Sequence, residues 1–213
     1  MNLNQTKYEL QNIISGKSSS SHDALIQTIT NHIRSGKRAS PMAKEKHQNK
    51  EEEANSLIDF ANNHNLFLNK IDESKFISSG AEQKVYIEGD NYVIKLNDAI
   101  YYASWEDYFY NLLLNNYFFS DTAYQLLGFS QNNETLYTVV KQSFAKADDL
   151  TDLTKVKEFL NNNGFISIRN HDYYNPSLGI ILEDLHDENV LTKKKLLYFI
   201  DTVFYINPDI FWN

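Results

Sequence analysis

Two carboxylates and one amide flank two short apolar runs near the end of the sequence. Asp184 precedes Asn189 by five residues, and Asp201 follows the apolar run 196–200. Three lysines separate that run from the apolar run 190–192, which predicts a β-hairpin that brings Asn189 and Asp201 together. Carboxylate and amide oxygens are suitable ligands for Mg²⁺, and a further carboxylate can receive or orient a hydroxyl group. The spacing therefore predicts a site suited to phosphoryl transfer.

The segment 184–189 matches, in order, the D-L-H-x-x-N loop of the small-molecule branch of the protein-kinase-like superfamily. The matching positions are Asp184, Leu185, His186 and Asn189. The wider strings 79–86 and 200–204 resemble the kinase domains found in polyvalent proteins of phages and conjugative elements. This resemblance covers about residues 53–213, and its specificity is concentrated in a few short motifs.

The resemblance implies a fold and a set of cofactors. The implied fold is α+β: a minimal, two-lobed kinase-like domain with a five-stranded antiparallel N-lobe sheet and a reduced C-lobe. ATP and Mg²⁺ are the implied cofactors, with Asp184 as the catalytic residue and Asn189 and Asp201 as the metal ligands. His186 either touches the γ-phosphate or braces the loop, and bracing is favoured because Mg²⁺ already neutralises the phosphate charge.

Short β-strands are expected between residues 76 and 96. Three runs rich in β-branched and aromatic residues alternate with turns, one of which contains Gly89. Lys95 lies in the last run, where an isolated lysine is usually solvated. The resemblance to kinases, however, implies that Lys95 holds the α- and β-phosphates of ATP. The resemblance also places three upstream residues around the nucleotide, namely Gly80, Ala81 and Val85.

A helix over residues 105–118 is predicted by an apolar stripe and by Ser104, a favourable N-cap. Its first turn contains Glu106 and Asp107. The resemblance implies that a carboxylate of this helix pairs with Lys95, and Asp107 is narrowly favoured because it precedes a core-facing tyrosine. The alternative is that both acids only offset the helix dipole.

Two further strands, 124–129 and 136–140, complete the expected five-stranded sheet. The chain is then expected to leave the sheet at a hinge over about residues 140–144. In the kinase resemblance, the backbone groups from Val140 to Gln142 would bind adenine.

Helices are also expected over residues 22–34, from about residue 51 to 61, and over 152–162, the last capped by Thr151. The predicted organisation is a basic, partly flexible helical segment, 1–50, and a kinase-like domain, 51–213. Within that domain we expect an N-lobe over about 51–140, the hinge, and a C-lobe over about 145–213.

The charge is unevenly distributed along the chain. Residues 1–50 contain 8 Lys+Arg and 3 Asp+Glu, a net charge of +5, whereas the whole chain has a net charge of −8. We expect the basic segment to fold back on the acidic remainder rather than bind nucleic acid, because its charges are scattered. The absence of cysteine excludes disulfides and zinc–thiolate sites, and no apolar run is long enough to span a membrane. A cytoplasmic protein is therefore expected.

The acceptor is not identified by the sequence. A hydroxyl group of protein Ser, Thr or Tyr, or of a small molecule, would suit Asp184. Twelve residues follow Asp201, so a partner chain or residues 1–50 are expected to complete the acceptor site. The sequence also has one glycine in its nucleotide loop, and Thr202 where glycine is usual. A catalytically inactive, kinase-like module that binds a nucleotide or a partner is therefore the alternative, as is a small-molecule kinase.

Overall fold

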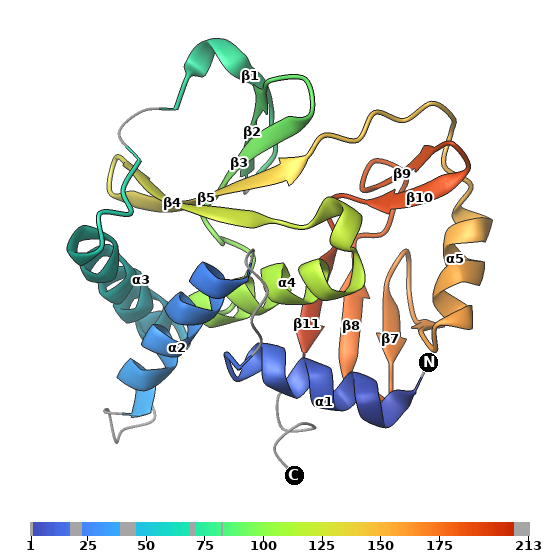
Figure 1. Cartoon of the computed structure of the whole chain (residues 1–213), viewed down its shortest axis with the longest axis horizontal. Coiled ribbons are helices and arrows are strands. Elements are labelled where there is room, and N and C mark those ends of the chain that lie inside the picture. The colour runs from blue at the N-terminus through green and yellow to red at the C-terminus, as the bar shows by residue number, and fades with distance from the viewer. Residues whose placement is uncertain (1, 18–22, 39–45, 69–70, 82, 207–213) are drawn as a thin grey trace.

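The computed structural model describes residues 2–17, 23–38, 46–68, 71–81 and 83–206, which form an α+β fold (Figure 1). The α-helices within these residues are α1 (Leu3–Ile14), α2 (Ala24–Arg38), α3 (Lys46–Asn63), α4 (Trp105–Phe118) and α5 (Leu153–Asn162). The strands are β1 (Phe76–Ser79), β2 (Gln83–Glu88), β3 (Tyr92–Asn97), β4 (Gln125–Asn132), β5 (Thr135–Ser143), β6 (Ile166–Ser167), β7 (Tyr173–Asn175), β8 (Ile180–Glu183), β9 (Val190–Lys193), β10 (Leu196–Phe199) and β11 (Val203–Ile206).

The predicted five-stranded antiparallel sheet is confirmed. Its strand order is β1-β2-β3-β5-β4, and every neighbouring pair is antiparallel. The β2–β3 turn contains Gly89 at φ 61°, a left-handed conformation that glycine adopts without strain. In this register Lys95 on β3 lies opposite Val85 on β2 and Val140 on β5. Residues opposite one another share a face of the sheet, so these three side chains lie on one side.

A four-stranded sheet and a separate hairpin follow the first sheet along the chain. The four strands are arranged β11-β8-β7-β6, and β9 pairs with β10. The predicted hairpin between Asn189 and Asp201 is confirmed, with Lys194 and Lys195 at φ 50° and 65° in its turn. Two consecutive residues with positive φ are typical of the tight turns whose twist matches that of paired strands.

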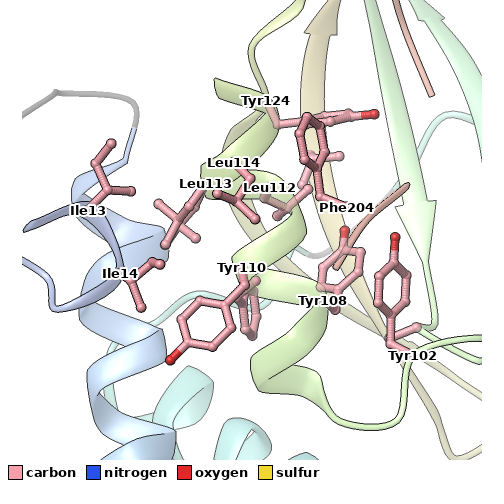
Figure 2. Close-up of a cluster of buried hydrophobic side chains, with 14 of the residues drawn as sticks. Ile13, Ile14, Tyr102, Tyr108, Tyr110, Leu112, Leu113, Leu114, Tyr124 and Phe204 are labelled. Atoms are coloured by element: carbon pink, nitrogen blue, oxygen red, sulfur yellow. The ribbon is translucent and has the colours of Figure 1, made fainter. Parts of the chain in front are cut away.

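Helix α4 lies near the centre of the molecule, below the five-stranded sheet in Figure 1, and contacts α1, α2 and β11. The predicted Ser104 cap is confirmed, because the Ser104 side chain accepts a hydrogen bond from the backbone N–H of Asp107. Most of the helix is buried, since it is covered on several sides. Figure 2 shows Ile13 and Ile14 of α1 on one side of α4, and Tyr102 and Phe204 on the other.

The N-terminal helices contribute to the same hydrophobic core as α4. Buried apolar residues of α1 and α2 belong to the cluster that includes Leu113 and Phe204. Arg34 of α2 reinforces this packing, because its guanidinium group lies 3.3 Å from the Glu106 carboxylate and donates to the Tyr110 hydroxyl oxygen at 2.6 Å. Within the described residues, α1 and α2 therefore pack against α4.

Several element boundaries differ from the sequence prediction. Helix α1 was not predicted, and α2 continues through Gly36 to Arg38 because the cost of one glycine in a helix, about 1 kcal/mol, is too small to end it. Helix α3 begins at Lys46 rather than near residue 51. Helix α5 is capped by Asp152 rather than Thr151, since the Asp152 carboxylate accepts from Thr154 N–H. The serine-rich segment 18–21 lies outside the described residues.

Candidate active site

The Asp184 loop begins where β8 ends and is held together by its own side chains. Nε2 of His186 lies 3.1 Å from Oδ1 of Asp184, and the Asn189 amide donates to Oδ2 of Asp184 at 2.8 Å. The backbone N–H of Glu188 donates to Nδ1 of His186 at 3.3 Å. The Asp184 side chain is 57% exposed, so this carboxylate is oriented by the loop and is open to solvent.

Asp184 adopts a backbone conformation that is uncommon for a non-glycine residue. Its φ is 67°, and its N–H donates to Oδ1 of Asp172 at 3.3 Å. The neighbouring N–H of Leu185 donates to the carbonyl oxygen of His171 at 3.3 Å. Residues 171–172 thus support the loop from outside the matched motif. Left-handed backbone at such residues is maintained only where surrounding contacts fix it, and it occurs frequently at functional sites.

Burial raises the pKa of Glu183, the last residue of β8. The negative charges of Asp172 and Asp184 add to this increase, and Arg169 partly offsets it. The charges of Asp172 and Asp184 therefore lie close enough to Glu183 to disfavour its ionised form.

The β9–β10 hairpin places Asp201 beside Asn189 along the backbone. Ile200 N–H donates to the carbonyl oxygen of Asn189 at 2.9 Å, and Asp201 is the next residue. The amide nitrogen of Asn189 donates hydrogen bonds to Asp184, whereas the amide oxygen of Asn189 has no hydrogen-bond partner among the described residues. One amide oxygen and one carboxylate are a donor set that Mg²⁺ accepts when phosphate oxygens complete the shell. The residues present fit this ion.

Lys95 is 5% exposed and is held on the Asp201 side of the sheet. Its ammonium group lies 3.4 Å from Oδ2 of Asp201 and donates to the carbonyl oxygen of Ile200 at 3.0 Å. It also lies 5.6 Å from the ring centroid of Tyr124. A buried cation requires such partners because its desolvation is otherwise costly. The structure thus unites the expected phosphate lysine with the expected metal ligand.

Gln83 is a site residue that the sequence reasoning missed. Its side-chain amide donates to Oδ2 of Asp201, the oxygen that also faces Lys95. Gln83 lies opposite Asn97, two positions along both strands from the pair formed by Val85 and Lys95. Alternate residues of a strand share a face of the sheet. The alternation of β2 and β3 could therefore have placed Gln83 on the same face as Lys95.

The predicted ion pair between Lys95 and Asp107 is wrong. The Asp107 carboxylate instead accepts from the Ser104 hydroxyl group at 2.7 Å, while Glu106 contacts Arg34 and Tyr110. Tyr108, Asn111 and Leu112 of α4 line the space near Lys95. Successive residues of a helix are rotated by about 100°, so Glu106 lies on nearly the opposite side of α4 from Tyr108. The register of α4 therefore directs Glu106 away from the lysine, whereas Asp107 is held at the start of the helix by its hydrogen bonds with Ser104.

The predicted adenine-binding hinge also differs from the structure. Val140 and Gln142 lie inside β5, which continues to Ser143. Val140 pairs with Lys95 on one side and with Leu126 on the other. The Gln142 side chain is buried and donates to the carbonyl oxygen of Thr122 at 2.8 Å. These residues are engaged in sheet pairing and packing, and the chain leaves the sheet after residue 143.

The residues expected around the nucleotide phosphates lie at the β1–β2 turn and on β2. Gly80 and Ala81 are exposed, and Val85 is half-buried opposite Lys95. Gly80 N–H donates to the carbonyl oxygen of Gln83 at 2.9 Å, which closes the turn. A Cβ atom at Gly80 would meet no protein atom within 4 Å, so the space beside this glycine is open.

Two cavities of different size lie near these elements. A cavity of about 20 Å³ is lined by Lys95 and Asp201 and by residues of α4. It therefore lies between the Lys95–Asp201 pair and that helix. A pocket of about 720 Å³ opens between α1, the C-terminal end of α4 and the end of β5. The larger pocket is lined by Gln142 but contains none of the predicted catalytic or metal-binding residues, so its size does not mark the reaction site.

The chain matches the model of a known protein family. Residues 50–208 match the model of the serine/threonine/tyrosine kinase found in polyvalent proteins. The chain belongs to this family. The predicted resemblance to polyvalent-protein kinases is thereby confirmed. No curated protein and no solved structure matches the chain.

Among the described residues of this polyvalent-protein kinase, no helix is long and apolar enough to cross a membrane. In the same part of the chain, no group of three or more His, Cys, Asp or Glu side chains is arranged to hold a metal ion.

Proposed function

We propose that this polyvalent-protein kinase is an ATP- and Mg²⁺-dependent phosphotransferase that transfers the γ-phosphate to a hydroxyl group. The observation that carries the proposal is the convergence of Lys95 and Asp201 beside the loop of Asp184 and Asn189. Lys95 on β3 and the segment 184–201 lie far apart in the sequence. A buried lysine beside a carboxylate that a short hairpin joins to an amide suits Mg²⁺ and phosphate together.

Each of the site residues has a separate role in this proposal. Asn189 and Asp201 would hold Mg²⁺, which supplies charge neutralisation at the phosphates. Lys95 would bind phosphate oxygens after exchanging part of its contact with Asp201. The exposed Asp184 carboxylate receives or orients the acceptor hydroxyl, and His186 and Asn189 hold it in place. Fixed donors and acceptors lower the barrier because little reorganisation is needed during the transfer.

The remaining features of the proposal concern the lobes and the acceptor. We assign the five-stranded sheet with α4 to an N-lobe and the strands after β5 to a reduced C-lobe, so that the nucleotide lies between them. The acceptor is proposed to be a Ser, Thr or Tyr hydroxyl group of a protein, and a partner chain is proposed to complete its binding surface. A catalytically inactive module is less consistent with the site, because Lys95, Asp184, Asn189 and Asp201 are all present.

Calorimetric titration with ATP, in the presence and absence of Mg²⁺, tests the proposal. We expect Mg²⁺ to strengthen wild-type binding tenfold or more. In its presence, Lys95→Ala and Asp201→Ala should each weaken binding by tenfold or more, on the order expected for a lost charged contact. Lys84→Ala is the matched control, because Lys84 is a lysine of the same sheet whose ammonium group lies over the Tyr137 ring. If the folded wild type does not bind ATP, the proposal is wrong.

A further inference from the structure

Gln83 links three parts of the candidate site. Its side-chain amide donates to Oδ2 of Asp201, and its backbone carbonyl oxygen accepts from Gly80 N–H at 2.9 Å. The same Oδ2 atom lies 3.4 Å from the ammonium group of Lys95. One residue of β2 therefore connects the glycine turn, the lysine and the aspartate that follows β10.

These contacts occupy the two oxygens of Asp201 unequally. Oδ2 faces two donors, Gln83 and Lys95. Oδ1 has no hydrogen-bond partner among the described residues. A carboxylate held by one oxygen cannot rotate freely, so the direction of its other oxygen is fixed as well. The Asp201 side chain is 28% exposed, which leaves part of it accessible from outside the protein.

The chemical nature of Gln83 suits this arrangement. An amide donates a hydrogen bond without adding charge, so Lys95 and Asp201 remain a balanced pair of one cation and one anion. A second cation at this position would compete with a metal ion for the carboxylate, and a second carboxylate would repel Asp201. A neutral donor orients the aspartate and preserves its negative charge.

We propose that Gln83 is a positioning residue of the nucleotide site, which fixes Asp201 through Oδ2 so that Oδ1 is presented to Mg²⁺. This inference rests on the proposed function. Gln83 acts through Asp201 and touches neither the metal nor the acceptor. Its backbone bond to Gly80 ties the same arrangement to the turn proposed to cover the phosphates.

The substitution Gln83→Met tests this role, because methionine preserves the length of the side chain but removes the donor. The matched control is Gln131→Met, which changes an exposed glutamine of β4 in the same sheet. Calorimetry with ATP at a series of Mg²⁺ concentrations measures the concentration of Mg²⁺ that gives half-maximal binding. We expect Gln83→Met to raise that concentration about tenfold, the effect typical of losing a hydrogen bond to a charged group.

A second titration, with ATP and no divalent cation, separates positioning from a structural role. We expect Gln83→Met to leave this metal-free affinity within about twofold of the wild type, whereas local unfolding of β2 would weaken both affinities equally. Gln83→Asn, which retains an amide one methylene group shorter, should raise the Mg²⁺ requirement in the same direction. Equal weakening with and without Mg²⁺ would overturn the inference.

The outcome also distinguishes this inference from the proposed function. If the wild type binds ATP with Mg²⁺ and Asp201→Ala abolishes that binding, an unchanged Mg²⁺ requirement in Gln83→Met refutes only the role of Gln83. If the wild type itself shows no Mg²⁺-dependent binding, both the proposed function and the role of Gln83 are wrong.

Discussion

The ammonium group of Lys95 lies 3.4 Å from Oδ2 of Asp201, although the two residues are more than one hundred positions apart in the sequence. Lys95 is almost completely buried, whereas Asp201 is partly exposed. The pair therefore joins the five-stranded sheet to the segment between β10 and β11. Asp201 thus has two roles, because its carboxylate balances the charge of Lys95 and is proposed to hold the metal ion.

Removal of one charge from this pair should destabilise the fold. We expect Asp201→Asn to lower the free energy of unfolding by about 2 kcal/mol, because it leaves a buried lysine without its counter-charge. The double variant Lys95→Met/Asp201→Asn should recover at least half of that loss, since it removes the unpaired charge. Urea denaturation of the four proteins in this cycle measures the coupling, and strictly additive losses would contradict it.

The exposed carboxylate of Asp184 is expected to affect activity more than stability. Asp184→Asn should reduce Mg²⁺-dependent ATP turnover by about a hundredfold or more, the range for removing a positioned proton acceptor. The melting temperature should change little, because the side chain is 57% exposed. Asp187→Asn, a neighbouring loop acid, is the control. Equal turnover by Asp184→Asn and the wild type would remove Asp184 from the mechanism.

Two glycines of the five-stranded sheet and its turns should respond very differently to alanine. Gly128 has φ +150°, and a Cβ atom there would lie 2.1 Å from the carbonyl oxygen of Leu66. Gly128→Ala should therefore lower the free energy of unfolding by about 3 kcal/mol or more. Gly80→Ala should leave stability within about 0.5 kcal/mol, because its surroundings are open. Urea denaturation compares the two variants, and similar losses would be inconsistent with these environments.

The contact between Arg34 and Glu106 should stabilise the docking of α2 on α4. Both side chains are less than one-fifth exposed, and the Tyr110 hydroxyl group bridges them. We expect Arg34→Met to lower the free energy of unfolding by about 2 kcal/mol without changing ATP affinity. Lys75→Met breaks the exposed pair with Glu88 and should change the free energy of unfolding much less, because solvent screens that pair. A reduced ATP affinity in Arg34→Met would instead connect α2 to the nucleotide site.

Tyr117 should give the protein a specific sensitivity to alkaline pH. Burial, together with the hydrogen bond from the Tyr117 hydroxyl group to Glu9, raises the pKa of Tyr117 to about 12. A raised pKa stabilises the protonated folded state. That stabilisation is present below the unfolded pKa of 10.0 and is lost as the pH rises toward 12.

Thermal unfolding between pH 9 and 12 measures this effect. Tyr117→Phe should show a smaller loss of stability over that interval than the wild type, because the titrating group is absent. Tyr8→Phe is the control, since Tyr8 lies on α1, the helix that contains Glu9, and is 60% exposed. Identical pH profiles for the wild type and Tyr117→Phe would contradict the assignment.

The sequence by itself determined those elements that depend on local pattern. Alternating apolar residues and turn residues were sufficient to predict the strands β1 to β5. A favourable N-cap and an apolar stripe were sufficient to predict α4. The hairpin that brings Asp201 to Asn189 followed from two apolar runs and the lysines between them. These features are local, because strand period, turn residues and caps act over a few positions.

Only the tertiary structure decided which side chains meet across those elements. The rotation of α4 about its axis places Tyr108 and Asn111 near Lys95 and directs Glu106 to Arg34, and one residue of shift in that helix would change the partners. The pairing of β2 with β3 brings Gln83 to Asp201, and the extension of β5 to Ser143 places Val140 and Gln142, both buried, inside a strand. Such contacts join residues far apart in the chain, so they depend on packing between elements, which local sequence patterns do not specify.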